Sequence, residues 1–294
     1  MSLKAVCFGE VLWDVFPSHK KIGGAPLNVA LRLQSLGTYT NIISKVGKDI
    51  NGAILVDYIQ ENMVSTDYIQ KDNTYETGKV TVLLQQDGSA TYEIDHPVAW
   101  DKIELTNALQ DLVSSADVFV FGSLSCRDNV SRTTLYQLAR ASKFNVFDVN
   151  LRVPHYTNDI LLHLMKVSDF IKFNDEEIIE ISNFNNLKYN SLEEYIKAIS
   201  KFTKTNQICV TRGAEGAILY LNDTFYYNKG IKVNVVDTVG AGDSFLAALI
   251  SKLLNNEDAQ HALDYACAIG SIVASKEGAN AIISEEEIKS ILSI

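Results

Sequence analysis

The sequence lacks several patterns, and each absence argues against a class of protein. Its four cysteines form no C-x-x-C pair and most of them lie in apolar runs, so we expect buried free thiols at Cys7, Cys126, Cys209 and Cys267. No apolar run reaches the roughly 18 residues that a membrane span needs, and the N-terminal stretch MSLKAVCFGE has no signal-peptide core. We therefore expect a cytoplasmic enzyme or small-molecule binder.

Positive charge is also scarce. The 26 lysines and arginines are outnumbered by 36 acidic residues, for a net charge of -10, which argues against a broad nucleic-acid surface but not against a local basic pocket. The chain contains no G-x-x-x-x-G-K-S/T motif, and no G-x-G-x-x-G follows the first apolar run. A P-loop nucleotide site is therefore excluded, and a dinucleotide-dependent dehydrogenase is disfavoured. The five histidines have no metal-like spacing and receive no role.

The residues that are present predict one α/β domain. With 294 residues, 47% of them hydrophobic, the chain can bury a large core, and we expect residues 1–294 to form a single domain. Short β-type runs such as KAVCFGEV and DVFVFGSL alternate with amphipathic runs such as PLNVALRLQSLG. Because this alternation is typical of parallel strands joined by helical crossovers, we predict a three-layer α/β/α fold around a mostly parallel sheet.

Two segments interrupt this alternation. Residues 13–24, WDVFPSHKKIGG, are polar and turn-rich where a helix is expected, and residues 77–94, TGKVTVLLQQDGSATYEI, are predicted to form two strands around an Asp87-Gly88 turn. Both segments suit a small β appendage. Since an isolated hairpin is not stable, it must pack on the domain or pair with a second copy in a homodimer.

The stretch DTVGAGDSF, residues 237–245, precedes a run with apolar residues at helical spacing. Its glycines therefore stand at a predicted helix N-terminus, where unpaired amides and a partial positive charge bind anions. The amides of Gly240, Ala241 and Gly242 would stabilise a moving phosphoryl group while Asp243 orients a hydroxyl and accepts its proton. We expect the helix N-terminus to hold the pKa of Asp243 below its usual value of about 3.9. The alternative is an ordinary glycine turn whose acidic residue complements the helix dipole.

A second segment of the sequence narrows the interpretation of DTVGAGDSF to one protein family. Together with IGGAPLNVALRLQSLG, residues 22–37, the DTVGAGDSF segment closely resembles the two motif regions of the ribokinase-like (PfkB) carbohydrate kinases. GEVLWDVFP, residues 9–17, and HPVAWD, residues 96–101, resemble the fructokinases of that family more specifically. The resemblance runs from Val6 to about Ala281, with the intervening elements in the family's order.

The resemblance implies a fold and a reaction. Family members have an α/β core with a β lid over the sugar, and the lid here would comprise residues of about 12–24 and 77–98. They transfer the γ-phosphate of ATP to a sugar hydroxyl. The GAGD turn, here Gly240, Ala241 and Gly242, serves them as anion hole and its aspartate, here Asp243, as catalytic base. The fructokinase-like segments favour fructose as acceptor and fructose 6-phosphate as product.

The sugar side of the family's site falls on four residues near the N-terminus. An aspartate after the first strand and a GG-x-x-x-N segment bind sugar hydroxyls in the family, and the matching positions are Asp14, Gly23, Gly24 and Asn28. The chemistry agrees, because a polyol needs both acceptors and donors and these side chains offer them. The alternatives are a solvated loop acid at Asp14 and a capping role for Asn28 at a helix N-terminus.

Two further segments match elements near the phosphates. Asn174 and Glu177 in FNDEEI resemble the family's N-x-x-E, which organises magnesium largely through water, as suits a cation that retains its waters. The same spacing is also that of a capping box, and both roles are compatible. DVNLR, residues 148–152, resembles a D-P-N-x-R segment that places Arg152 near the phosphate or the sugar. Val149 stands where the family commonly has proline, which puts the local loop geometry in doubt.

The nucleotide side and a cation site are implied by the resemblance alone. VTRGAEGA, residues 210–217, resembles the family's T-x-G-x-x-G segment beside ATP, and its glycines also suit a tight turn. Asn280 falls where the family has a loop near adenine. Many members bind a monovalent cation such as potassium through backbone oxygens near the D-T-x-G-A-G-D segment. The matching positions are Thr211, Gly213 and Gly216 for ATP, and Asp237 and Val239 for the cation.

Other functions stay open from the sequence. Within the family, 2-keto-3-deoxygluconate, ribose or a nucleoside are alternative acceptors, because acceptor choice depends on side chains that one sequence does not place. A sugar-binding regulatory protein without catalysis is an alternative from another class, although such a protein needs neither the GAGD aspartate nor N-x-x-E. An NAD-dependent oxidoreductase is a third.

Overall fold

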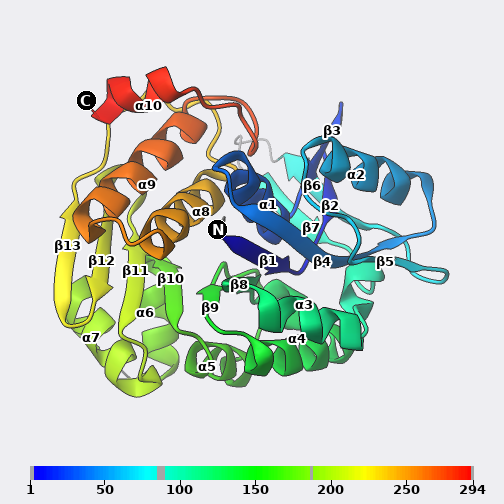
Figure 1. Ribbon diagram of the computed structural model, residues 1–294, viewed down its shortest axis with the longest axis horizontal. Coiled ribbons are helices and arrows are strands. Elements are labelled where there is room, and N and C mark those ends of the chain that lie inside the picture. Colours follow the sequence, from blue (N-terminus) through cyan, green and yellow to red (C-terminus); the bar gives the residue numbers. More distant parts are fainter. Residues whose placement is uncertain (1–2, 85–89, 186–187, 293–294) are drawn as a thin grey trace.

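A nine-stranded sheet forms the centre of the molecule (Figure 1). The computed structural model describes residues 3–84, 90–185 and 188–292. The strands run in the order β13-β12-β11-β10-β9-β8-β1-β4-β5, and every neighbouring pair from β11 to β5 is parallel, whereas β12 and β13 are antiparallel. Their bounds are β1 Lys4–Phe8, β4 Tyr39–Gly47, β5 Ile69–Asp72, β8 Val118–Gly122, β9 Asn145–Asp148, β10 Phe170–Asn174, β11 Gln207–Thr211, β12 Ala217–Leu221 and β13 Thr224–Asn228.

Helices cover both faces of this sheet, so the predicted three-layer fold is confirmed. Alternation along the buried strand β1 sends Ala5 and Cys7 into one core and Val6 and Phe8 into the other. The first core is completed by α1, α2, α8 and α9, and the second by α3 to α7. The bounds are α1 Ala25–Ser35, α2 Ile50–Glu61, α3 Asn107–Ser115, α4 Asn129–Ala141, α5 Asn158–Lys166, α6 Asp175–Phe184, α7 Leu192–Thr203, α8 Ala241–Leu254, α9 Ala259–Ala274 and α10 Glu285–Leu292.

A separate small sheet is built from the two segments that interrupt the α/β alternation. It has the order β3-β2-β6-β7, with bounds β2 Leu12–Val15, β3 Lys20–Gly23, β6 Gly78–Leu84 and β7 Ala90–Ile94. The β6–β7 pair is antiparallel, which confirms the strand pair predicted in residues 77–94. The β2–β3 pair is also antiparallel, and a parallel β2–β6 pair joins the two segments. The predicted Asp87-Gly88 turn lies outside the described residues.

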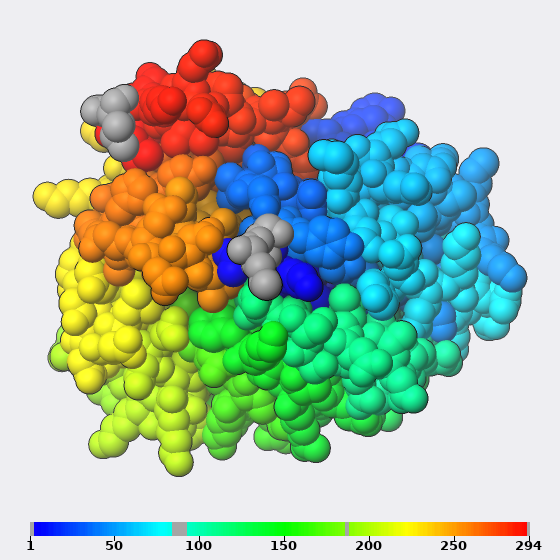
Figure 2. All heavy atoms as spheres, viewed as in Figure 1, coloured from blue at the N-terminus to red at the C-terminus, as the bar shows by residue number. Residues whose placement is uncertain are grey.

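Both ends of the chain contribute to one part of the molecule. In Figure 2, residues around α1, in blue, lie beside the orange region, where α1 packs against α8. All four cysteines are buried and unpaired, as expected. Within residues 3–84, 90–185 and 188–292, no helix combines the length and the apolar character that a membrane crossing requires.

Candidate functional site

The GAGD turn opens α8, as the sequence predicts. Gly240 is the N-cap in the left-handed region (φ 74), and a Cβ there would lie 2.3 Å from the Cβ of Ala279. Only glycine therefore suits this position. The amides of Gly242 and Asp243 lie in the first turn, where a helix leaves its N–H groups without intrahelical acceptors. Ala241 N, one of the predicted donors, already donates to the carbonyl of Thr238 at 3.3 Å. The cradle is therefore open at Gly242 and Asp243 rather than at Ala241, and its role in catalysis stays a prediction.

Asp243 is joined to the sugar-side motif by a direct hydrogen bond. Asn28 Nδ2 donates to Asp243 Oδ2 at 2.8 Å. Burial raises the pKa of Asp243 to about 6, and the nearby charge of Asp148 adds to this, while Asn28, Lys172 and Arg152 act in the opposite direction. Our expectation of a lowered pKa is wrong, because desolvation and a second carboxylate outweigh the helix N-terminus.

Asn28 lies inside α1 rather than at its cap. Its backbone N–H donates to the N-cap residue Gly24 at 2.9 Å, so the capping alternative for its side chain is wrong. The side chain is buried and also accepts from Asn280 Nδ2 at 3.2 Å. One turn later, Arg32 donates to Ser244 Oγ at 3.1 Å and to the carbonyl of residue 281 at 2.8 Å. Two successive turns of α1 therefore hold the start of α8 in place.

The other sugar-side residues surround Asp14. A Cβ on Gly23 would lie 2.3 Å from Asp14 Oδ2, and a Cβ on Gly24 (φ 116) would lie 2.4 Å from the carbonyl oxygen of Glu10, so both glycines permit close backbone approach. Asp14 is half-buried, and burial raises its pKa to about 6 although Arg152 acts to lower it. The solvated-acid alternative for Asp14 is therefore wrong.

Glu10 is a site residue that the sequence analysis missed. It is 3% exposed, and its Oε2 atom has no hydrogen-bond partner among the described residues. Burial raises the pKa of Glu10 to about 7, while Arg152 and Arg127 act to lower it. An acidic residue between the apolar run of β1 and the apolar residues Val11 and Leu12 is the signal that could have found it.

Arg152 is exposed and close to these acids. It lowers the pKa values of Glu10, Asp14 and Asp243, yet among the described residues its guanidinium group makes one hydrogen bond, from Nη1 to the carbonyl of Leu151 at 2.9 Å. The guanidinium group thus remains available for a ligand. Val149, at the position where proline is common in the family, is buried in the core.

A buried ion pair lies next to the cradle. Lys172 Nζ is 2.8 Å from Asp148 Oδ1, and both residues are under 8% exposed. Burial disfavours the charge on Lys172, but Asp148, Glu177 and Asp243 outweigh this effect and raise the pKa of its ammonium group. A Cβ on Gly242 would lie 3.6 Å from Lys172 Nζ. The sequence analysis assigned neither Asp148 nor Lys172 a role.

Asn174 and Glu177 form the capping box that their spacing permits. Glu177 N donates to Asn174 Oδ1 at 2.7 Å, and Asn174 N donates to Glu177 Oε2 at 2.8 Å. Glu177 Oε1 accepts from Leu151 N at 2.9 Å. Burial raises the pKa of Glu177, although Lys172 acts to lower it. The capping role is confirmed, and the magnesium role stays a prediction.

The predicted ATP segment lies at the end of β11. Thr211 is in register with Asn174 of β10 and donates to the carbonyl of Phe173 at 3.3 Å. Gly213 (φ 53) and Gly216 (φ 84) form the turn that follows, and a Cβ on Gly216 would lie 2.2 Å from the carbonyl oxygen of Asn228. The turn role of both glycines is confirmed, and contact with ATP remains a prediction.

Asp237 connects two loops. Its Oδ1 accepts from Val239 N at 3.0 Å and its Oδ2 from Gly278 N at 3.1 Å. Lys21 of the small sheet places its Nζ 3.9 Å from Asp237 Oδ2 and 3.1 Å from Glu277 Oε1. The potassium role of Asp237 and Val239 stays a prediction, but a protein cation is already present there.

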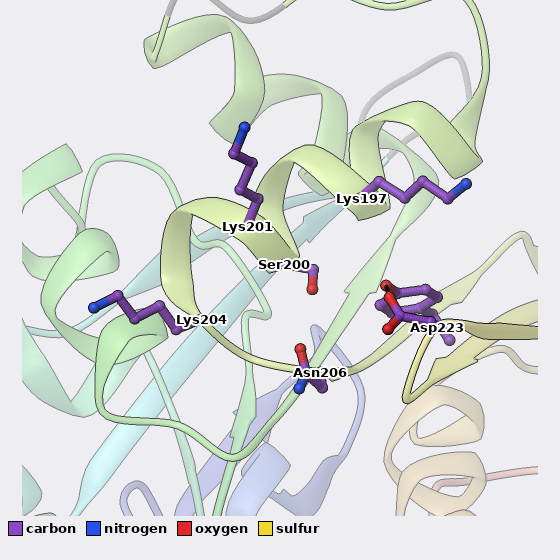
Figure 3. A pocket seen from close by; sticks show the side chains of 7 residues that line it. Lys197, Ser200, Lys201, Lys204, Asn206 and Asp223 are labelled. Carbon is purple, nitrogen blue, oxygen red and sulfur yellow. Dashed lines mark hydrogen bonds between the residues drawn. The ribbon is translucent and has the colours of Figure 1, made fainter.

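Cavities open to solvent lie beside Asn280 and on α7. One, of about 490 Å³, lies beside Asn280 and is lined by Trp13, Lys20, Lys21, Ile22, Tyr58 and residues 277–281. The adenine role predicted for Asn280 is untested, and the residue contacts the sugar-side Asn28. The other cavity, of about 600 Å³, lies on α7, and Figure 3 shows that Lys197, Lys201 and Lys204 point away from one another there. Their charges do not converge on a common ligand.

Comparison with known proteins agrees with this arrangement. The model of the "pfkB family carbohydrate kinase" matches residues 3–286. The chain is 30% identical to "Probable fructokinase-6, chloroplastic" of Arabidopsis thaliana, over 93% of this chain and 78% of the relative. It is 30% identical to "Fructokinase-2" of Zea mays, over 93% and 89%.

Solved structures share the fold over nearly the whole chain. A fructokinase of Xylella fastidiosa with bound ATP superposes with a TM-score of 0.88 at 23% identity, covering 100% of this chain and 99% of its own. An uncharacterized sugar kinase of Pyrococcus horikoshii in complex with ATP superposes with a TM-score of 0.81 at 28% identity, covering 98% and 97%.

Proposed function

Because the chain belongs to the pfkB family of carbohydrate kinases, we propose that it transfers the γ-phosphate of ATP to a hydroxyl group of a neutral sugar, and that this sugar is fructose. The observation that carries the proposal is the 2.8 Å hydrogen bond between Asn28 and Asp243. It joins the segment that resembles the family's sugar-binding motif to the carboxylate in the first turn of α8, so a hydroxyl group bound beside Asn28 would lie within reach of a base.

Asp243 is suited to accept the proton of the hydroxyl. With a pKa of about 6, it is largely ionised at pH 7 and is a stronger base than an ordinary aspartate. The first-turn amides of α8 and the ammonium group of Lys172, close to Gly242, would stabilise negative charge on the phosphoryl group. The small sheet, residues of about 12–24 and 77–98, would act as a lid that excludes water, a competing acceptor.

Local charge favours a neutral acceptor. Glu10, Asp14 and Asp243 lie near Arg152, and Arg127 is held by Asp101 at 2.7 Å. An acidic sugar such as 2-keto-3-deoxygluconate would meet more negative than positive charge. Arg127 Nη1 and Glu10 Oε2 are also buried without partners among the described residues. Since a hydroxyl group both accepts and donates, a polyol can satisfy an unpaired donor and an unpaired acceptor.

The choice of fructose among neutral sugars is supported by the relatives' names alone. The curated relatives from Arabidopsis thaliana and Zea mays are named fructokinases. Ribose and nucleosides remain the alternatives.

ATP would lie along the ends of β10 and β11, beside Asn174, Thr211, Gly213 and Gly216. The Pyrococcus horikoshii relative is an ATP complex, and Asn174 and Thr211 are in register. Asn280 is proposed for the adenine side on the family resemblance alone.

Magnesium fits as an ion held by the phosphates rather than by a protein cage. The described residues contain no group of three or more His, Cys, Asp or Glu side chains that could hold a metal. Asp148 Oδ2 is buried without a partner among those residues, and Glu177 and Asn174 lie nearby. These oxygens can receive hydrogen bonds from magnesium-bound water. The bound ion would neutralise phosphate charge.

Location and assembly are part of the proposal. We place the enzyme in the cytoplasm and propose a homodimer that forms through the small sheet, because two hairpins gain stability by pairing with another sheet. Sedimentation at micromolar concentration measures the second point, and a monomer there would remove it.

A single assay tests the reaction. ADP release is measured with ATP and magnesium in the presence of fructose, ribose, 2-keto-3-deoxygluconate, adenosine or no sugar, for the wild type and for Asp243→Asn. We expect fructose-dependent release that the substitution abolishes. If another sugar is used, the acceptor is wrong and the kinase remains; if no acceptor gives ADP, the sugar-binding regulator becomes the better interpretation.

A further inference from the structure

A lysine of the small sheet contacts the loops around the start of α8. Lys21 is half-buried on β3, directly before the segment that contains Gly23 and Gly24. Its Nζ atom lies 3.1 Å from Glu277 Oε1 and 3.9 Å from Asp237 Oδ2. The contact therefore links two parts of the chain that are more than 200 residues apart.

Asp237 has a formal charge that its amide partners do not balance. The N–H groups of Val239 and Gly278 donate to its two oxygens, but amides are neutral. Among the described residues, Lys21 is the cation within 4.0 Å of this carboxylate. Glu277 is more exposed than Asp237, with side-chain exposures of 78% and 23%, so its charge is more strongly screened by water.

A free monovalent cation does not fit this arrangement well. An ion bound to Asp237 Oδ2 would lie only a few ångströms from the Lys21 ammonium group, and two positive charges at such a separation repel. The lysine is also part of the chain, so its ammonium group has a high effective concentration at Asp237, whereas a potassium ion must bind from solution. The chain's own residues thus disagree with a potassium requirement.

We propose that Lys21 takes the place of the monovalent cation at Asp237, so that this chain needs no potassium and its small sheet is tied by one charge to the start of α8. The proposal rests on the proposed kinase function for its meaning in catalysis. Lys21 acts as a positioning residue and touches no reacting atom.

The ion pair is connected to the candidate site through a series of neighbouring contacts. Gly278 is bonded to Asp237, and the next residue, Ala279, is the one against which Gly240 packs. Asn280 then donates to Asn28, which holds Asp243. A charge at Lys21 therefore fixes a loop that contacts both the anion cradle and the sugar-side amide.

The test removes the charge of Lys21 and asks whether potassium restores the stability and activity that are lost with it. Lys21→Met removes the ammonium group and keeps an unbranched side chain. Lys252→Met is the matched control, because Lys252 Nζ lies 2.9 Å from Glu257 Oε1 near the far end of α8, and both side chains are partly exposed, as in the pair of Lys21 and Asp237. Melting temperature and ADP release are measured in potassium, sodium or choline chloride at one ionic strength, with magnesium present throughout.

We expect the melting temperature of the wild type, and likewise that of Lys252→Met, to be the same in all three salts, and the ADP release rates of the two proteins to differ less than twofold. Lys21→Met should melt about 1 to 3 degrees lower than the wild type in choline. Potassium should raise the melting temperature of this variant and increase its turnover several-fold. Selective stabilisation of the wild type by potassium, or a Lys21→Met protein indifferent to the cation, would overturn the proposal. The melting data need no sugar, so they decide the matter even if the kinase function is wrong.

Discussion

The hydrogen bond from Asn28 to Asp243 should set the pH at which the enzyme becomes active. Because the pKa of Asp243 is raised to about 6, its ionised fraction falls below that pH, and kcat/KM should fall with it. In Asn28→Ala the carboxylate of Asp243 loses a hydrogen-bond donor that favours its charged form, so its pKa should rise further. The acid limb of the pH profile, where kcat/KM falls with decreasing pH, should therefore move to higher pH.

The size of the movement follows from the contact. A hydrogen bond to a charged group contributes roughly 1.5 to 3 kcal/mol, and one pKa unit corresponds to about 1.4 kcal/mol. Asp243 is half-buried, so water would replace part of the lost bond and the lower end applies. We expect the acid limb to rise by about one unit, from about 6 to about 7.

The assay is ADP release over pH 5 to about 9, analysed as kcat/KM because that ratio reports the free enzyme. Glu10 also has a raised pKa, of about 7, so the comparison is made in a Glu10→Gln background. Asn280→Ala is the matched control: it removes the other bond of Asn28 and leaves the one to Asp243. An acid limb that stays in place in Asn28→Ala, or that moves equally in Asn280→Ala, would refute the reasoning.

Two further predictions concern stability, measured by urea unfolding. Lys172→Met should lower the free energy of unfolding by about 3 to 5 kcal/mol, because Asp148 is left buried without its partner. The Asp148→Asn/Lys172→Met double variant should recover part of this, and a loss below about 1 kcal/mol in the single variant would contradict the pairing. Gly240→Ala should cost about 2 to 4 kcal/mol, since its Cβ would lie 2.3 Å from that of Ala279. Gly213→Ala, with no atom within 4 Å of the new Cβ, should cost about 1 kcal/mol, and equal losses would show that the close approach is unimportant.

The features that the sequence predicts correctly are those with local causes. The alternation of strands and helices predicts the layers, and the glycines of GAGD predict where α8 begins, because backbone conformation there depends on residues a few positions apart. The spacing of Asn174 and Glu177 predicts a capping box for the same reason.

The features that it misses depend on how distant strands are arranged. Asp148 and Lys172 each look like one charge in an apolar run, and they pair because β9 and β10 are neighbours in register. The pKa of Asp243 is raised by desolvation and by Asp148, neither of which is visible in the helix that carries it. Glu10 is a similar case, because its burial is created by residues elsewhere in the chain.

The bonds of Glu177 have a consequence for anyone who redesigns this enzyme. One oxygen accepts the amide that begins α6, on the proposed magnesium side, and the other accepts the amide of Leu151, directly before Arg152. A single carboxylate therefore contacts both the start of α6 and the residue before Arg152, the arginine proposed to lie near the phosphate or the sugar. Substitutions at Glu177 intended to change metal preference would also alter sugar selectivity, so a library for new acceptors should vary Arg152 and its loop while Glu177 is kept.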